Sequence, residues 1–359
     1  MWRSVCVVVL LAVLASVARA GSPRGKIAFL REGAVWLIAP DGTGERKIAS
    51  VGGKAGGLAW DPTGRYLTCT GLPFLPVIDT STGKVRRLSL PENREDGRLV
   101  RLASCGIPVW TRDGGNVLFT GRPSEDADGD GGLWQVDVDG KKPAVRVLPP
   151  EDGDVPVWFR PAVGPGQGRL ASLDRGAGYA DLRIFDIGAR KLLRFRPLPE
   201  KARVHVTDLA WSDKTVLWLA FDAEQDDIQE MRGPGGVHAW NLHTGSLRPL
   251  IETGHTVQSL QPSPDRTRLA YLLRPFTREA EQVAVCTLPG QKIKRITPPG
   301  EIRSLEAQAW SHDSHQFLIS GYASEKDSEQ LLYSAWVVDA ASGRSRLLVR
   351  NAESPVWSR

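Results

Sequence analysis

One stretch of sequence sets the pattern for the whole chain: Leu58-Ala59-Trp60-Asp61-Pro62-Thr63-Gly64-Arg65-Tyr66-Leu67. A tryptophan ends one apolar run, a turn with Asp, Pro and Gly follows, and a second apolar run begins. Short apolar runs separated by such turn residues are typical of antiparallel β-strands joined by tight hairpins. The same order of features recurs along the chain, so this stretch is one copy of a repeat.

The repeat has seven copies, and each has an anchor position at the end of its first apolar run. Tryptophan occupies five anchors, and a smaller residue replaces it in the other two. The anchors are Trp60, Trp110, Val163, Trp211, Pro262, Trp310 and Trp357, spaced 47 to 53 residues apart. Four short strands in about 50 residues match one blade of a β-propeller. We therefore predict an all-β, seven-bladed β-propeller with four-stranded antiparallel blades, in which the five anchor tryptophans are structural core residues.

The ends of the repeat region predict how the ring closes. The first copy starts at Ile27–Phe29, which corresponds to the second strand of a blade, and the last anchor, Trp357, belongs to a first strand. The C-terminal strand is therefore expected to complete the first blade and close the ring.

The turn motif also carries a family resemblance. Trp60–Gly64 and Ser263–Asp265 resemble the Trp-Ser-Pro-Asp-Gly core of TolB-type propeller repeats, which are related to WD repeats. The resemblance covers Ile27 to Trp357 and implies the fold, whereas proteins that carry this repeat differ in function. The chain departs from TolB itself, because we expect no room for an extra amino-terminal domain and we count seven units rather than six.

The first 20 residues have the features of a Sec-type signal peptide. Arg3 precedes an apolar run from Val5 to Val17, and Ala18-Arg19-Ala20 ends the segment with small residues at the positions that a signal peptidase reads. No cysteine stands at the cleavage point, so there is no lipobox. We predict cleavage of residues 1–20, one propeller domain over residues 21–359, a secreted or periplasmic location, no membrane span and a monomer.

Three cysteines follow the signal segment: Cys69, Cys105 and Cys286. An odd number cannot form a complete disulfide framework. A bridge between Cys69 and Cys105 and burial of all three as free thiols both remain open at this stage.

Acidic residues gather in the longer connections between strands. The tight turns should share one face of the ring, and the variable loops at 120–132, 221–236, 274–281 and 320–330 should share the other. Variable loops on a rigid scaffold commonly form binding surfaces. Candidate binding residues for a protein or peptide partner are the acids of the loop face: Asp222, Glu224, Asp226, Asp227, Glu230, Glu151, Asp152 and Asp154.

Basic residues follow the outer strands, as at Arg86 and Arg87. Lysine and arginine on exposed strand edges prevent edge-to-edge aggregation. No stacking aromatic residues accompany them, which argues against nucleic acid, as does the export signal. A polyanionic cell-envelope polymer is the alternative ligand for this basic rim.

One loop has the pattern of a calcium site. Carboxylates alternate at Asp126, Asp128 and Asp130 before Gly131, and this arrangement suits a hard cation because oxygen ligands converge where the chain turns sharply. The segment resembles the Asp-x-Asp-x-Asp-Gly loops of several propellers, although Trp134 stands where those loops commonly have an acid. A solvated acidic loop is the alternative.

Motifs for catalysis are scarce in this sequence. There is no Gly-x-Ser-x-Gly nucleophile elbow, and the six histidines lack the spacing of a zinc site. The sequence therefore favours an exported non-enzymatic binding scaffold. The alternative is a metal-dependent propeller hydrolase or lyase that acts on a small molecule at the central channel, with acids contributed by several blades.

Overall fold

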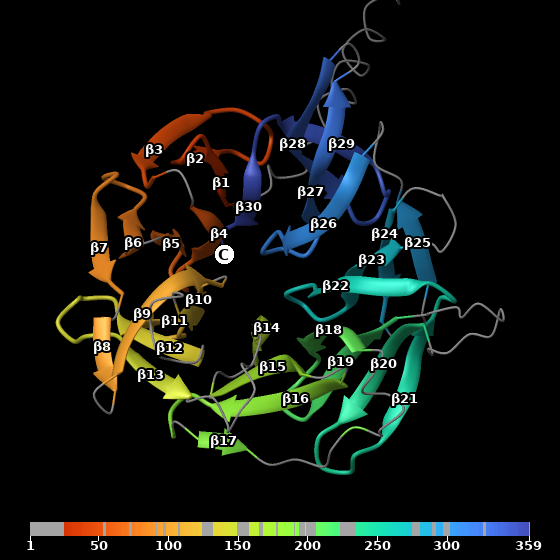
Figure 1. Cartoon of the computed structure of the whole chain (residues 1–359). Coiled ribbons are helices and arrows are strands. Elements are labelled where there is room, and N and C mark those ends of the chain that lie inside the picture. The colour runs from red at the N-terminus through yellow and green to blue at the C-terminus, as the bar shows by residue number, and fades with distance from the viewer. Residues whose placement is uncertain are drawn as a thin grey trace, which may run out of the picture.

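The computed structural model describes residues 25–358 except 53–54, 72–73, 91, 96–97, 107, 124–131, 149–157, 165–167, 177–178, 190, 194–197, 199–205, 223–234, 275–280, 289–291, 297–301 and 326–327. The described residues form β-strands and no helix. Seven antiparallel sheets stand around a central axis (Figure 1). The prediction of a seven-bladed β-propeller is confirmed.

The first three blades are numbered along the chain, with strands given from the axis outward. Blade 1 contains β30 (Glu353–Trp357), β1 (Ile27–Arg31), β2 (Ala34–Ile38) and β3 (Arg46–Ser50). Blade 2 contains β4 (Gly56–Trp60), β5 (Tyr66–Thr70), β6 (Phe74–Asp79) and β7 (Val85–Ser89). Blade 3 contains β9 (Arg98–Cys105) and β10 (Val109–Trp110), which both pair with β11 (Asn116–Pro123), then β12 (Gly132–Asp137) and β13 (Val145–Leu148). A short strand, β8 (Glu92–Glu95), pairs with β9.

The other four blades have four strands each. Blade 4 contains β14 (Trp158–Val163), β15 (Arg169–Gly176), β16 (Tyr179–Asp186) and β17 (Lys191–Leu193). Blade 5 contains β18 (Val206–Trp211), β19 (Val216–Phe221), β20 (Gly236–Asn241) and β21 (Leu247–Glu252). Blade 6 contains β22 (Thr256–Pro262), β23 (Arg268–Arg274), β24 (Gln282–Thr287) and β25 (Lys292–Ile296). Blade 7 contains β26 (Ile302–Trp310), β27 (Gln316–Glu325), β28 (Ser328–Asp339) and β29 (Ser345–Val349).

The last strand closes the ring, as the sequence predicted. β30 pairs antiparallel with β1, and Ile27 lies opposite Trp357. Beside this pair, Lys26 N donates to Ser358 Oγ and Ser358 N donates to Lys26 O, both at 2.8 Å. These two bonds join residues that are 332 positions apart in sequence.

The side chain of Arg31 forms hydrogen bonds with the segment just before β30. Its Nε donates to Asn351 O and its Nη2 donates to Arg350 O, both at 2.9 Å. The guanidinium also lies 5.0 Å from the ring centroids of Phe29 and Trp36, within the range of a cation–π contact. Arg31 thus connects the second strand of blade 1 to the segment that leads into its first strand.

The anchor tryptophans pack between blades. Four of them are buried and Trp60 is half-buried. Four indole N–H groups donate to a backbone carbonyl of the preceding blade, at the residue just before that blade's own anchor. The pairs are Trp60–Val356 (3.3 Å), Trp110–Ala59 (3.1 Å), Trp211–Ala162 (2.9 Å) and Trp310–Gln261 (2.7 Å). Four of the five anchor tryptophans therefore lie in the core, and the indoles also join one blade to the next.

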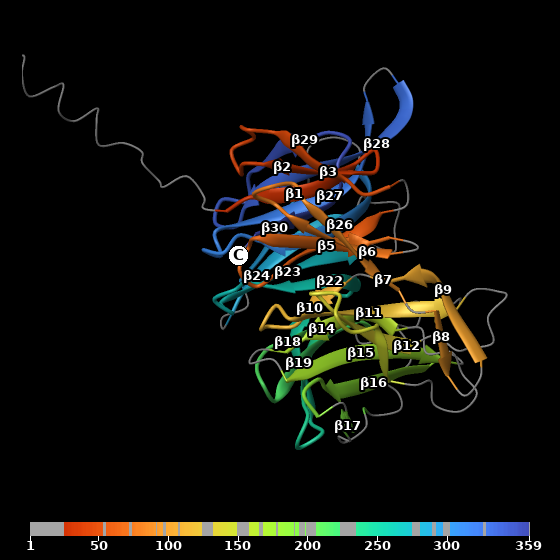
Figure 2. The ribbon, with the colours of Figure 1, turned by 90° about the vertical axis from the view of Figure 1, so that its left-hand side faces the viewer.

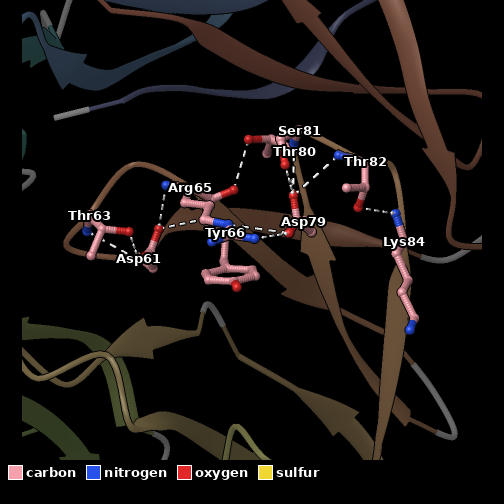
Figure 3. Close-up of polar contacts among 9 residues, drawn as sticks. All are labelled: Asp61, Thr63, Arg65, Tyr66, Asp79, Thr80, Ser81, Thr82 and Lys84. Atoms are coloured by element: carbon pink, nitrogen blue, oxygen red, sulfur yellow. Dashed lines mark hydrogen bonds and ion pairs between the residues drawn. The ribbon is translucent and has the colours of Figure 1, made fainter.

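The two tight turns of a blade lie side by side on one face, as Figure 3 shows for blade 2. Asp61 Oδ1 accepts the backbone N–H of Arg65 at 2.8 Å, and Thr80 N donates to Arg65 O at 3.0 Å. Hydrogen bonds from Ser81 and from the Arg65 guanidinium hold the pKa of Asp79 well below its usual value. Blades 3 to 7 repeat the backbone bond between turns, with Val138, Ile187, Leu242, Leu288 and Ala340 as donors. We call this side of the ring the tight-turn face and the opposite side the long-loop face.

The expectation of a loop at 320–330 was wrong. β27 continues to Glu325 and β28 begins at Ser328, so the two strands form a long hairpin. The rings of Tyr322 and Tyr333 meet edge to face with centroids 4.9 Å apart, and Ser320 Oγ donates to Tyr333 Oη at 3.2 Å. These cross-strand contacts stabilise strand pairing beyond the body of the blade. In Figure 2 this hairpin and the β8–β9 hairpin project on the side opposite the C-terminus.

Candidate binding surfaces at the two ends of the ring

Most of the acidic candidates lie outside the described residues. This holds for Glu224, Asp226, Asp227, Glu230, Glu151, Asp152 and Asp154, and for the calcium candidates Asp126, Asp128 and Asp130. Asp222 is the member of the set that the structure describes. It directly follows β19 and accepts a hydrogen bond from the hydroxyl of Thr256, the first residue of β22 in the next blade. The acidic segment 223–234 therefore starts from a position fixed across the junction of blades 5 and 6.

The two residues that flank a second connection of the long-loop face contact each other directly. Arg274 ends β23 and Glu281 precedes β24, and Arg274 Nε lies 2.9 Å from Glu281 Oε1. This ion pair brackets the connection at 275–280. Tyr322, on the β27–β28 hairpin, presents an aromatic side chain at this end of the molecule with 41% of its surface exposed.

The tight-turn face has two adjoining pockets beside the central axis. The larger has a volume of about 450 Å³ and is lined by residues of blades 6, 7 and 1, among them Pro262, Trp310, His312 and Trp357. The smaller, of about 260 Å³, lies among the first strands of blades 4, 5 and 6. Gln261, Pro262 and Arg266 line both. The larger volume falls within the range of about 300–1,000 Å³ that is common for small-molecule sites.

The pockets adjoin an anchor that lacks tryptophan. An indole at position 262 would lie against blade 5, as the indoles of the tryptophan anchors lie against their preceding blades. Proline leaves that space, and the neighbouring turn supplies a different contact, because Arg266 donates to the carbonyl of Trp211. Arg266 adopts a left-handed backbone conformation, with φ of 60°. The sequence signal for these pockets is the loss of tryptophan at the anchors Val163 and Pro262.

The inner strands bulge at one position of the repeat, three residues before the anchor. Gly57, Ser259 and Ser354 all have positive φ there, of 57°, 54° and 49°. In blade 5 this position is Asp208, a buried residue whose Oδ2 accepts the backbone N–H of Leu260 in blade 6 at 2.8 Å. The Asp208 carboxylate therefore supports the bulge of the neighbouring blade.

The outer strands make contacts that sequence reasoning missed. Basic side chains on four of them donate to a backbone carbonyl in the tight turn of the following blade. The pairs are Arg46–Thr80, Arg86–Val138, Lys294–Ala341 and Arg346–Pro40. The side chains of the basic rim therefore join blades, a role in addition to the protection of edges that the sequence indicated. The sequence pattern that accompanies these contacts is a basic residue near the start of an outer strand and, in the next blade, a tight turn that ends in Gly.

Cys69, Cys105 and Cys286 are all free, so the Cys69–Cys105 bridge is not formed, and burial raises the pKa of the Cys69 and Cys105 thiols to about 12. Within the described ranges, no group of three or more His, Cys, Asp or Glu side chains is arranged to hold a metal ion.

In the same part of the chain, no helix is long and apolar enough to cross a membrane.

Comparison with known proteins gives no match to a family model and no match to a curated protein. Solved structures do match. TolB from Acinetobacter baumannii aligns over 94% of this chain and 67% of its own, with 15% identity and a TM-score of 0.54. A puromycin-hydrolysing peptidase from Mycobacterium tuberculosis aligns over 92% of this chain, with 15% identity and a TM-score of 0.63. This chain spans 54% of that peptidase.

A third neighbour has yet another activity. An oligogalacturonate lyase in complex with manganese aligns over 91% of this chain and 86% of its own, with 12% identity and a TM-score of 0.58. At such identities a likeness shows the fold alone. The chain therefore shares its propeller fold with TolB-like proteins and with enzymes of different activities.

Proposed function

We propose that the protein is an exported, non-enzymatic binding scaffold that engages a protein or peptide partner through its long-loop face. The proposal rests on the residue that immediately precedes the acidic segment 223–234. This residue, Asp222, is held by a hydrogen bond from the hydroxyl of Thr256 in the next blade. The segment that follows it contains Glu224, Asp226, Asp227 and Glu230. A partner with a basic surface would complement this charge, which favours rapid and selective association.

The described part of the same face also suits a protein partner. Tyr322 is exposed on a hairpin whose strands pair beyond the body of the blade. Tyrosine is enriched at protein interfaces because its ring gives a large contact area while its hydroxyl still forms hydrogen bonds. The indole and guanidinium bonds between blades favour a rigid ring, so little ordering of the scaffold would accompany binding.

If residues 1–20 act as the signal peptide that the sequence predicts, the proposed partner lies in the periplasm or outside the cell. The alternative, a metal-dependent hydrolase or lyase, would need acids from several blades to meet at the channel. Turnover of a small molecule only after addition of a divalent metal would favour that alternative over the scaffold.

The test compares charge removal on the two faces. A partner recovered by crosslinking in the exported compartment is titrated against the double variant Asp226→Asn, Asp227→Asn. The control is Asp41→Asn, Asp139→Asn, which removes two exposed acids from the tight-turn face. We expect the loop variant to bind several-fold more weakly, with the larger loss at low salt, because exposed charges are screened beyond about 8 Å at physiological ionic strength. Equal affinity of the loop variant and the unchanged protein would contradict the proposal.

A further inference from the structure

The larger pocket on the tight-turn face has no acidic side chain in its wall. Its lining contains one guanidinium, Arg266, and one imidazole, His312, and the remaining residues are uncharged. The nearby carboxylate of Asp265 is occupied within its own turn, where Oδ1 accepts from Ser263 Oγ at 2.6 Å and from Thr267 N at 3.0 Å. Asp213, outside the wall, lies close enough to Arg266 for the two charges to interact. Within the wall itself the permanent charge is positive, which favours a negative group there over a cation.

The rest of the wall combines apolar side chains with the polar side chains of Gln261, Ser263 and Ser358. Its apolar part comes from Pro262, Pro264 and the largely buried indoles of Trp310 and Trp357. Trp310 Nε1 is already bonded to Gln261 O at 2.7 Å, so its indole contributes mainly apolar ring surface. Pockets that combine apolar surface with a few placed polar groups can orient a small ligand by one charged end.

We infer that this pocket binds the carboxylate of an apolar ligand, with the negative group toward Arg266 and His312 and the apolar body against the prolines and indoles. A small organic acid and the C-terminal residue of a peptide both have this chemistry. The site lies on the face opposite the proposed partner surface, so it is a second site and does not depend on the acids at 222–230.

Calorimetric titration of the purified protein tests the inference with matched pairs of probes. 2-Naphthylacetate is compared with 2-naphthylacetamide, and acetyl-Gly-Pro-Phe with a free carboxylate is compared with its C-terminal amide. We expect each carboxylate to bind at least about tenfold more tightly than its amide, since charge-assisted hydrogen bonds are the stronger ones. Tighter binding of the peptide acid identifies a chain end as the ligand, and tighter binding of naphthylacetate identifies a free acid.

Two variants locate the site. Arg266→Gln removes the positive charge and also the bond to the Trp211 carbonyl, so its folding is checked by melting. His312→Glu leaves that bond intact and adds a carboxylate at an exposed position in the wall. Both variants are expected to bind the carboxylate probe about tenfold or more weakly than the unchanged protein does. Ala189→Glu is the control, because it adds the same charge on the tight-turn face outside the pocket.

Three results would overturn the inference. They are equal affinity for acid and amide, unchanged affinity in the folded His312→Glu variant, and the absence of binding by both acids at concentrations of about 10 mM. None of these depends on the proposed partner, so failure here leaves the test of the long-loop face intact.

Discussion

Trp211 in blade 5 donates its indole N–H to the carbonyl of Ala162 in blade 4, at 2.9 Å. Trp240, in the same blade, is equally buried, but its Nε1 has no hydrogen-bond partner among the described residues. Both rings belong to one hydrophobic cluster. The two tryptophans therefore separate the contribution of the bond between blades from that of ring packing.

Replacing each ring by phenylalanine measures the difference. Trp211→Phe removes volume and leaves the Ala162 carbonyl without its donor, whereas Trp240→Phe removes volume and an unpaired N–H group. We expect Trp211→Phe to lower the free energy of unfolding by about 1 kcal/mol or more beyond Trp240→Phe. Chemical denaturation gives both values. Equal losses would show that the indoles act through packing alone.

The basic rim gives a second matched pair. Arg86 Nη1 donates to Val138 O at 2.6 Å, while Arg248, at the same position of β21, makes no such bond with described residues. Because the Arg86 side chain is half exposed, we expect Arg86→Leu to cost about 0.5–1.5 kcal/mol. Arg248→Leu is expected to change the free energy of unfolding by less than about 0.5 kcal/mol. A larger effect at Arg248 would mean that the rim charges act together and not through individual bonds.

The order of strands and the tight turns could be predicted because they depend on local chemistry. Asp61 and Asp79 fix their turns by bonds to residues two to five positions on, so the pattern of each turn is visible in a few residues. The anchor tryptophans recur in five of the seven copies, at the position where the indole packs between neighbouring blades. Because these features recur along the chain, the repeat can be recognised from the sequence.

Contacts between distant residues could not be predicted in the same way. The β27–β28 hairpin includes the cross-strand pair of Tyr322 and Tyr333. The sequence around these residues is rich in polar residues, which is why it predicted a loop. The pocket beside Pro262 depends on what faces it from blades 7 and 1, in particular Trp310 and Trp357. Arg31 lies 320 positions from Asn351, and no local pattern indicates that bond.

Ring closure is tested by removing the last strand. Deletion of residues 353–359 removes β30 and leaves the edge of β1 unpaired, which favours aggregation through exposed strand edges. We expect a large loss of cooperativity in thermal melting. Arg31→Met keeps β30 but removes the bonds to Asn351 and Arg350, so we expect a smaller loss of about 1–3 kcal/mol. A deletion variant that melts at the temperature of the intact chain would show that closure contributes little to stability.

Calcium binding at Asp126, Asp128 and Asp130 stays a prediction of the sequence. If the folded state binds the ion, millimolar calcium raises the melting temperature by mass action. Asp128→Ala should abolish that rise, whereas Asp139→Ala, at an exposed turn position, should leave it intact. Melting curves with calcium and with chelator decide the question. No response of the unchanged protein to calcium would leave a solvated acidic loop.

Binding at the long-loop face is tested most directly by photo-crosslinking in cells that export the protein. p-Benzoylphenylalanine is placed at Tyr322 on the long-loop face, at Ala189 on the tight-turn face outside the pocket, and at Arg87 on the rim. The proposed function predicts one specific protein adduct from position 322, absent from the other two and lost when Asp226, Asp227 and Glu230 are neutralised. Adducts from position 87 together with none from position 322 would contradict it and place the functional surface on the basic rim.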